Sequence, residues 1–132
     1  MDLQHCLLCP RACGANRKKT AGLCGGGAEL RAARAALHFW EEPCISGTGG
    51  AGAIFFSGCA LRCCYCQNQQ ISQEHFGTVL SIAKLSEIIL RLQEEGAETI
   101  DLVTGSHYTP WIVESLQQVK KKLHIPVVWN SS

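Results

Sequence analysis

Nine cysteines, all within the first half of a 132-residue chain, constrain this sequence more than any other feature. An odd number leaves at least one thiol outside any closed set of disulfides. The opening residues MDLQH lack the basic and then apolar pattern of an export signal, so we expect a reducing, cytoplasmic compartment, where disulfides are rare. The thiols are therefore expected to bind metal or to carry chemistry.

The composition describes a globular chain without a charge bias toward nucleic acid or membranes. Hydrophobic residues make up 46% of the chain and charged residues 17%, with a formal net charge of +1. This balance argues against disorder and gives no basic footprint for nucleic acid or an anionic membrane. No apolar run approaches the ~18–20 residues of a membrane span. We therefore expect one soluble domain, with at most a small appendage.

Three segments follow one another along the chain. Residues 1–27 are Cys-rich and aperiodic, so they are expected to need a metal or a neighbouring domain for stability. The glycines at 25–27 are interpreted as a flexible boundary. Residues 28–52 form a connecting segment whose sequence has alternating and helical features at once, so its secondary structure is left open. It ends in the tract 46–52, which is expected to be a flexible loop because it lacks the Gly-Lys-Ser/Thr ending of a phosphate-binding loop.

Residues 53–132 alternate between strand and helix patterns. Apolar runs predict strands at 53–56, 99–104 and 125–129. Between them, Ser81 and Gly96 delimit a helix over 82–95, and Thr109-Pro110 begins a second helix. The expected inward residues are Ile82, Leu85, Ile88, Ile89 and Leu92 on the first helix, and Ile112, Val113, Leu116 and Val119 on the second.

This alternation predicts an α/β fold with parallel strands and helical crossovers. Functional groups of such sheets gather at the carboxyl ends of the strands. The loops at 57–70, at 105–109 and from 130 onward are therefore expected to share one edge.

The first of these loops contains Cys59, Cys63 and Cys66 in a Cys-x3-Cys-x2-Cys pattern. Three thiolates on one short loop can bind three irons of a cuboidal cluster and leave the fourth iron open, whereas structural zinc takes four ligands. The loop has no histidine, although Cys64 or a distant residue could complete a zinc site. Otherwise Cys64 and the isolated Cys44 are expected to be small packing residues, with Cys44 buried.

The triplet, with Tyr65 before its last cysteine, resembles the signature of the radical S-adenosylmethionine (SAM) superfamily. The blocks HCLLCPRACGANR, WEEPCISG, FFSGCALRCCYCQN and PVVWNSS are similar to the subgroup described as pyruvate formate-lyase-activating-enzyme-like. The resemblance covers nearly the whole chain. It implies the N-terminal part of a radical-SAM partial (β/α) barrel, preceded by a small Cys-rich segment.

The resemblance also implies a [4Fe–4S] cluster on Cys59, Cys63 and Cys66, whose open iron chelates SAM and whose electron cleaves it to a 5′-deoxyadenosyl radical. A one-electron reductant of the flavodoxin or ferredoxin type would supply the electron. The other cofactor-binding residues implied are Tyr65 beside the adenine, then Thr104, Gly105, Ser106, Asn130 and Ser131. The loop at 104–107 reads TGSH, where many relatives have Gly-Gly-Glu. The subgroup's name suggests a glycyl-radical protein as substrate but does not specify it.

Length adds a further expectation. Superfamily barrels usually have six βα units of about 30–35 residues, roughly 200 in all. Residues 53–132 hold two such units and one strand. We therefore expect a truncated first part of the barrel, with a hydrophobic sheet edge exposed.

The remaining candidates carry two interpretations each. Cys6, Cys9, Cys13 and Cys24 suit structural zinc or a second iron–sulfur cluster equally by count, with reduced or redox-active thiols as the alternative. His107 is a candidate acid/base or hydrogen donor, or a residue packed on Trp111. The Glu41-Glu42 pair could bind a cation, although a solvated or Arg-paired role is favoured. The alternative to the enzyme as a whole is a non-catalytic zinc-binding module.

Overall fold

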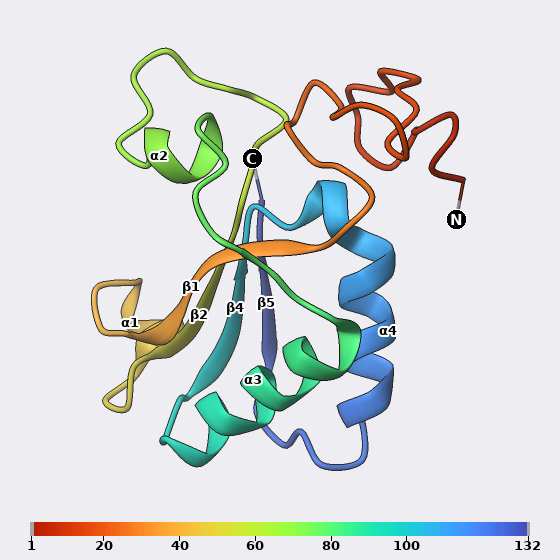
Figure 1. The fold of residues 1–132 in the computed structure, drawn as a ribbon. Helices are drawn as coiled ribbons and strands as arrows, with labels where there is room; N and C mark the ends of the chain where they lie inside the picture. Colours follow the sequence, from red (N-terminus) through yellow and green to blue (C-terminus); the bar gives the residue numbers. More distant parts are fainter. Residues whose placement is uncertain (1, 132) are drawn as a thin grey trace.

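The structure is a computed structural model and describes residues 2–131. Figure 1 shows a sheet with two long helices on one side and an irregular N-terminal segment at one end. The elements in chain order are β1 (Arg31–His38), α1 (Pro43–Ser46), β2 (Ala51–Phe56), α2 (Gln69–Ser72), β3 (Thr78–Val79), α3 (Ile82–Glu94), β4 (Thr99–Val103), a 3₁₀ turn (Ser106–Tyr108), α4 (Thr109–Val119) and β5 (Val127–Asn130).

The sheet is mixed, with strand order β3-β1-β2-β4-β5. Strand β4 pairs in parallel with β2 and with β5, through the helical crossovers α3 and α4, as the alternation predicts. Strand β1 pairs antiparallel with β2, and β3 pairs antiparallel with β1. The expectation of parallel strands therefore holds for β2, β4 and β5 alone. The segment at 28–52 contributes a strand because its alternating pattern pairs with β2.

Helices α3 and α4 cover one face of the sheet and enclose the core. The Ser81 hydroxyl accepts a hydrogen bond from the Lys84 N–H (3.1 Å), and Gly96 lies just beyond the helix with φ +95°. The predicted cap and the predicted stop residue of α3 are therefore confirmed, and the helix itself ends at Glu94, one residue before the predicted end. The core contains Ile54, Phe56, Leu85, Ile89, Leu92, Ile100, Leu102 and Ile112.

One predicted core residue is wrong. Val113 is exposed, and α4 instead buries Trp111 and Ser115 together with Ile112. The inward row of α4 thus includes Tyr108 just before the helix, then 111, 112, 115 and 119. Residue 113 lies about 100° around the helix from 112, outside this row.

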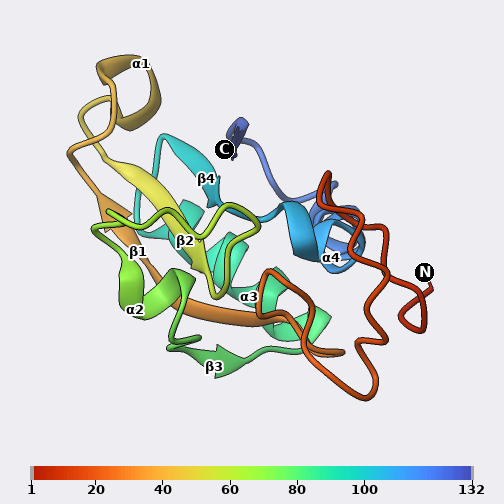
Figure 2. The same ribbon diagram turned by 90° about the horizontal axis from the view of Figure 1, so that it is seen from above.

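The opposite face of the sheet carries no long helix (Figure 2). Side chains alternate along each strand, so the residues between the core positions point to this face. They include Arg34 and His38 of β1, Asp101 of β4 and Asn130 of β5. A polar surface therefore lies directly beneath the loop that follows β2.

The N-terminal segment packs beside the start of α4 and the end of β2 (Figures 1 and 2). Leu3 and Arg17 are buried there. The glycines at 25–27 are not an open linker, because Gly22 donates to the Gly26 carbonyl and Gly25 to the Gly22 carbonyl. A Cβ at Gly26 would lie 2.7 Å from Nη2 of Arg17. Among the described residues, no helix has both the length and the apolar character to cross a membrane.

Candidate iron–sulfur site

The loop that carries the cysteine triplet begins where β2 ends. Gly58 has φ +86°, and a Cβ there would lie 2.4 Å from the carbonyl oxygen of Cys24. This close approach lets the N–H of Cys59 donate to the same carbonyl (2.9 Å), while Gly58 donates to the carbonyl of Ile71 (2.9 Å). The start of the loop is thus fixed between the N-terminal segment and α2.

Cys59, Cys63 and Cys66 are all half-buried. Cys59 and Cys66 line one cavity of about 80 Å³ with Phe56 and Thr104. The hydroxyl of Ser72 donates to the Cys66 sulfur (3.3 Å), and Nε2 of Gln73 donates to the Cys63 carbonyl (2.9 Å). Helix α2 and the residue after it, which sequence reasoning did not anticipate, therefore hold two of the three cysteines.

No three Cys, His, Asp or Glu side chains of the described residues stand close enough together to hold a metal ion. The donor set nevertheless fits an iron–sulfur cluster in its chemistry, since three partly shielded thiols share one loop and two share one cavity. Metal binding commonly arranges ligands that are not converged without it. The sulfur atoms would have to move toward one another within this loop for a cluster to bind.

The other predicted cofactor contacts lie at the same edge. Thr104 follows β4 with φ +58°, a backbone conformation that β-branched residues rarely adopt, and its N–H donates to the Asn130 carbonyl. The hydroxyls of Ser106 and Ser131 are 2.8 Å apart, so the loops after β4 and β5 meet. Gly105 is buried, and Tyr65 is 86% exposed.

A larger cavity of about 500 Å³ opens on the face of the sheet opposite α3 and α4. It is lined by Arg34, His38 and Glu41, and Gln67 and Asn68 join it directly to the cysteine loop. Sequence reasoning missed Arg34 and His38. The even spacing of Arg34 and His38, four residues apart in one strand, was the signal that could have placed them on one face.

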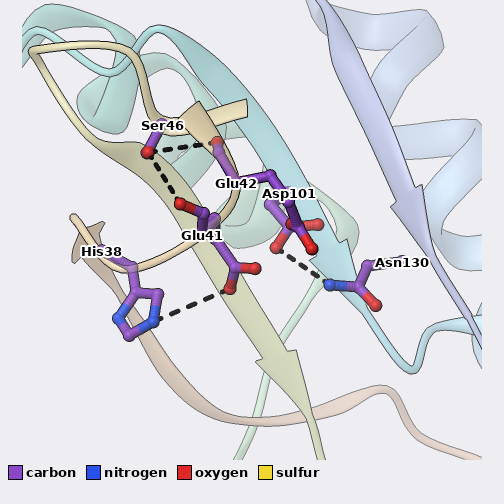
Figure 3. A network of polar contacts seen from close by, with 6 residues as sticks. All are labelled: His38, Glu41, Glu42, Ser46, Asp101 and Asn130. Atoms are coloured by element: carbon purple, nitrogen blue, oxygen red, sulfur yellow. Dashed lines mark hydrogen bonds and ion pairs between the residues drawn. The ribbon is translucent and has the colours of Figure 1, made fainter. Parts of the chain in front are cut away.

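Asp101 lies at the floor of this face and is fully buried. Nδ2 of Asn130 donates to Oδ2 of Asp101 (3.3 Å), while Oδ1 has no hydrogen-bond partner among the described residues. In Figure 3 the ion pair of His38 with Glu41 (3.7 Å) lies beside it. Burial raises the pKa of Asp101 above its ordinary value, against the hydrogen bond from Asn130. Glu41 is thus paired with histidine rather than with arginine, and Glu42 is exposed.

We expect Asp101→Asn to stabilise the protein at pH 8 by about 1 kcal/mol, because it removes a buried charge while keeping an acceptor for Asn130. An acid with a raised pKa contributes stability at low pH that is lost as the pH rises through its folded pKa. The gain should therefore vanish below pH 3.8, the ordinary pKa of the group. Urea unfolding of both proteins at the two pH values measures it. An equal difference at both would contradict this assignment.

His107 is 1% exposed and lies between the end of β2 and the N-terminal segment. Its Nε2 is 2.8 Å from the carbonyl of Ser57, which can only accept, so Nε2 carries the proton. Its ring stacks 4.3 Å from Tyr108, not on Trp111. Burial lowers the pKa of His107 to about 4. These contacts favour a packing role over the acid/base role.

A pH dependence of stability follows from His107. A lowered histidine pKa means that the unfolded chain binds the proton more readily, so stability is full above pH 6.5 and falls toward pH 4. The loss from this group should reach about 3 kcal/mol, since one pKa unit corresponds to about 1.4 kcal/mol. The control is His107→Gln, which keeps a donor but cannot titrate. If the native protein and this variant lose equal stability between pH 7 and 4, His107 is not the titrating group.

Two packing predictions for cysteines are wrong. Cys44, expected to be buried, is exposed because it lies in the short surface helix α1 after Pro43. Cys64 is also exposed, in a stretch of the loop where Arg62 and Tyr65 are exposed too. Cys6 and Cys24 are buried, and Cys9 and Cys13 are half-buried. Backbone N–H groups of Leu23 and Ala15 lower the pKa of Cys13, whereas burial raises the pKa of Cys24.

The family described as the 4Fe-4S single cluster domain matches residues 45–132, which include β2, the cysteine loop and both crossovers. The chain belongs to this family. It therefore contains a 4Fe–4S cluster-binding domain. An uncharacterized protein of Methanocaldococcus jannaschii is similar to it, with 29% identity over 98% of this chain. The chain spans 39% of the length of that relative. No solved structure matches the chain.

Proposed function

We propose that Cys59, Cys63 and Cys66 bind the cluster of this 4Fe-4S domain and that the chain belongs to a radical SAM enzyme. The observation that carries the proposal is the position of the three thiols. They follow β2 at the carboxyl ends of three parallel strands, where the loops after β4 and β5 also meet. This edge is where α/β sheets bind cofactors. Strands β2, β4 and β5 with their crossovers would be the first units of a partial barrel.

When bound, such a cluster supplies the electron that splits the sulfonium of SAM into methionine and a 5′-deoxyadenosyl radical, which takes hydrogen from a substrate. The residues of the chain would shield the cluster and orient the cysteines that hold it. Ser72 donates to one ligand sulfur, and the Gly58 turn fixes Cys59. Phe55 and Val103 line both the 80 Å³ cavity at the cysteines and the 500 Å³ cavity beside the loop, and they give each an apolar wall. The volume of the larger cavity, about 500 Å³, lies in the range of small-molecule and cofactor sites.

Tyr65, Thr104, Gly105 and Ser106 are proposed to contact SAM together with Asn130 and Ser131. The support is their position on the loop itself and at the ends of β4 and β5. The exposed ring of Tyr65 is available to stack on an adenine. A flavodoxin- or ferredoxin-type reductant, and a glycyl-radical protein as substrate, are further proposals that rest on the similarity to the pyruvate formate-lyase-activating-enzyme-like subgroup.

The test is anaerobic reconstitution of the complete gene product with iron and sulfide, followed by dithionite and SAM. We expect about four irons that depend on Cys59, Cys63 and Cys66, and the formation of 5′-deoxyadenosine. A reconstituted cluster that yields no 5′-deoxyadenosine would overturn the enzyme proposal. Zinc without iron or sulfide after anaerobic purification would support the alternative, a non-catalytic zinc-binding module, for which the four N-terminal cysteines are the specific observation.

A further inference from the structure

Arg17 is a buried cation without a carboxylate partner. Its side chain is 2% exposed, and none of the ion pairs among the described residues includes it. Nε donates to the Gly27 carbonyl (2.8 Å) and Nη1 to the His107 carbonyl (2.6 Å). Nη2 has no hydrogen-bond partner in the described part of the chain. A buried charge is costly unless an opposite charge compensates it.

The groups around this guanidinium are neutral rings and sulfur. The Arg17 Cζ lies 5.3 Å from the ring centre of Tyr108 and 5.2 Å from that of Trp111. Such cation–π contacts offset part of the cost of burial. Nη1 is 3.9 Å from the sulfur of Cys6. Burial raises the pKa of Tyr108 to about 12, so Cys6 rather than this phenol is the neighbour that can become an anion near neutral pH.

The N-terminal segment that holds Arg17 carries four thiols, which are near one another along the fold but not converged on one point. The backbone N–H of Cys6 donates to the Ala15 carbonyl, and the backbone N–H of Arg17 donates to the Leu3 carbonyl. These bonds fold the backbone of Cys6 and Cys13 into the same turn. A Cβ built on Gly22 would lie 3.5 Å from the Cys24 sulfur and 3.6 Å from the Cys13 sulfur. Cys9 lies within this turn, where its carbonyl accepts from the N–H of Ala12.

The backbone around these cysteines also favours anionic sulfur. The N–H of Gly26 donates to the Cys24 sulfur at 3.3 Å, two residues along the chain. Hydrogen bonds to a charged form stabilise that form, and thiolates are the form that binds metals. Glycine at 26 leaves room for the guanidinium, because a Cβ there would lie 2.7 Å from Nη2 of Arg17. The segment thus places a cation beside the Cys6 sulfur and an N–H donor at the Cys24 sulfur.

We propose that Cys6, Cys9, Cys13 and Cys24 bind a thiophilic metal centre as four thiolates and that Arg17 is its buried counter-charge. Four thiolates on Zn²⁺, or on a [4Fe–4S]²⁺ core, leave a net charge of −2, which the guanidinium partly neutralises. The thiols release their protons on binding, and the sulfurs converge as they do so. This centre lies outside residues 45–132 and does not rest on the proposed function.

The test uses the full chain with Cys59, Cys63 and Cys66 changed to alanine, so that remaining metal reports on the N-terminal set. After anaerobic purification we expect about one zinc, or about four irons with sulfide, per chain. Adding Cys9→Ser or Cys13→Ser should reduce that metal to background, whereas Cys44→Ser, at an exposed position, should leave it unchanged. A triple variant without stoichiometric metal would overturn the proposal, and so would Cys9→Ser and Cys13→Ser variants that keep it.

The role of Arg17 is tested with Arg17→Met, which keeps length without charge, and Arg17→Lys, which keeps the charge. In competition with a chromophoric chelator, Arg17→Met should bind Zn²⁺ at least 10-fold more weakly than Arg17→Lys. In the chelated, metal-free protein, Arg17→Met should be no less stable than the native chain, because it removes an uncompensated cation. Equal zinc affinity in the two variants would refute the counter-charge, and a metal-free Arg17→Met that unfolds would show a packing role instead.

Discussion

Cys59→Ala, Cys63→Ala and Cys66→Ala are each expected to remove the iron of the 4Fe-4S domain almost completely. A cubane bound by three protein thiolates loses one of only three anchors in each variant, and the remaining sulfurs cannot hold it against solvent. The cavity shared by Cys59 and Cys66 also opens when either side chain is shortened. Iron, sulfide and broad visible absorption after anaerobic reconstitution measure the loss. In the complete gene product, we expect 5′-deoxyadenosine formation to disappear in parallel.

Cys64→Ala is the matched control, because the same loop carries this thiol in an exposed position. It should keep its iron and its absorption within the error of the measurement. If Cys64→Ala lost iron as completely as Cys63→Ala, the proposed ligand set would be wrong. Iron loss confined to Cys6, Cys9, Cys13 or Cys24 variants would instead move the cluster to the N-terminal segment.

Gly58→Ala is expected to cost about 2–4 kcal/mol of unfolding free energy. The left-handed backbone at φ +86° contributes about 1–2 kcal/mol, and a Cβ 2.4 Å from the Cys24 carbonyl forces a backbone shift of similar cost. That shift breaks the hydrogen bond from Cys59 to Cys24, which joins the cysteine loop to the N-terminal segment. Denaturant unfolding in reducing buffer gives the free energy.

Gly96→Ala separates the two causes. Gly96 also has a positive φ, +95°, yet a Cβ there meets nothing within 4 Å. This variant should lose only the conformational cost, about 1–2 kcal/mol. The Gly58→Ala variant should also show faster alkylation of Cys24, because the contact that covers this buried cysteine is disturbed. Equal destabilisation of the two variants would mean that the contact with Cys24 contributes nothing.

Local patterns sufficed for the elements that depend on near neighbours. The Ser81 cap, the Gly96 stop and the Thr109-Pro110 start are properties of single turns, so α3 and α4 begin where predicted. The predicted end of α3 differs by one residue, and the last strand begins two residues late, after Pro126. The spacing of Cys59, Cys63 and Cys66 and their place after β2 were also evident in the chain. Short-range sterics and hydrogen bonds decide these features.

Tertiary structure alone decided which residues surround a side chain and how far that side chain is exposed to solvent. Nothing local shows that the aspartate in TIDLV is fully buried beside Asn130, because the strands around it come from distant segments. The same holds for Arg17, whose partners include residues about 90 positions away, and for the exposure of Cys44 and Cys64. Sequence therefore determined the residue types of the candidate site and the order of elements. Packing determined the desolvation of each polar group, and hence its charge and the chemistry available to it.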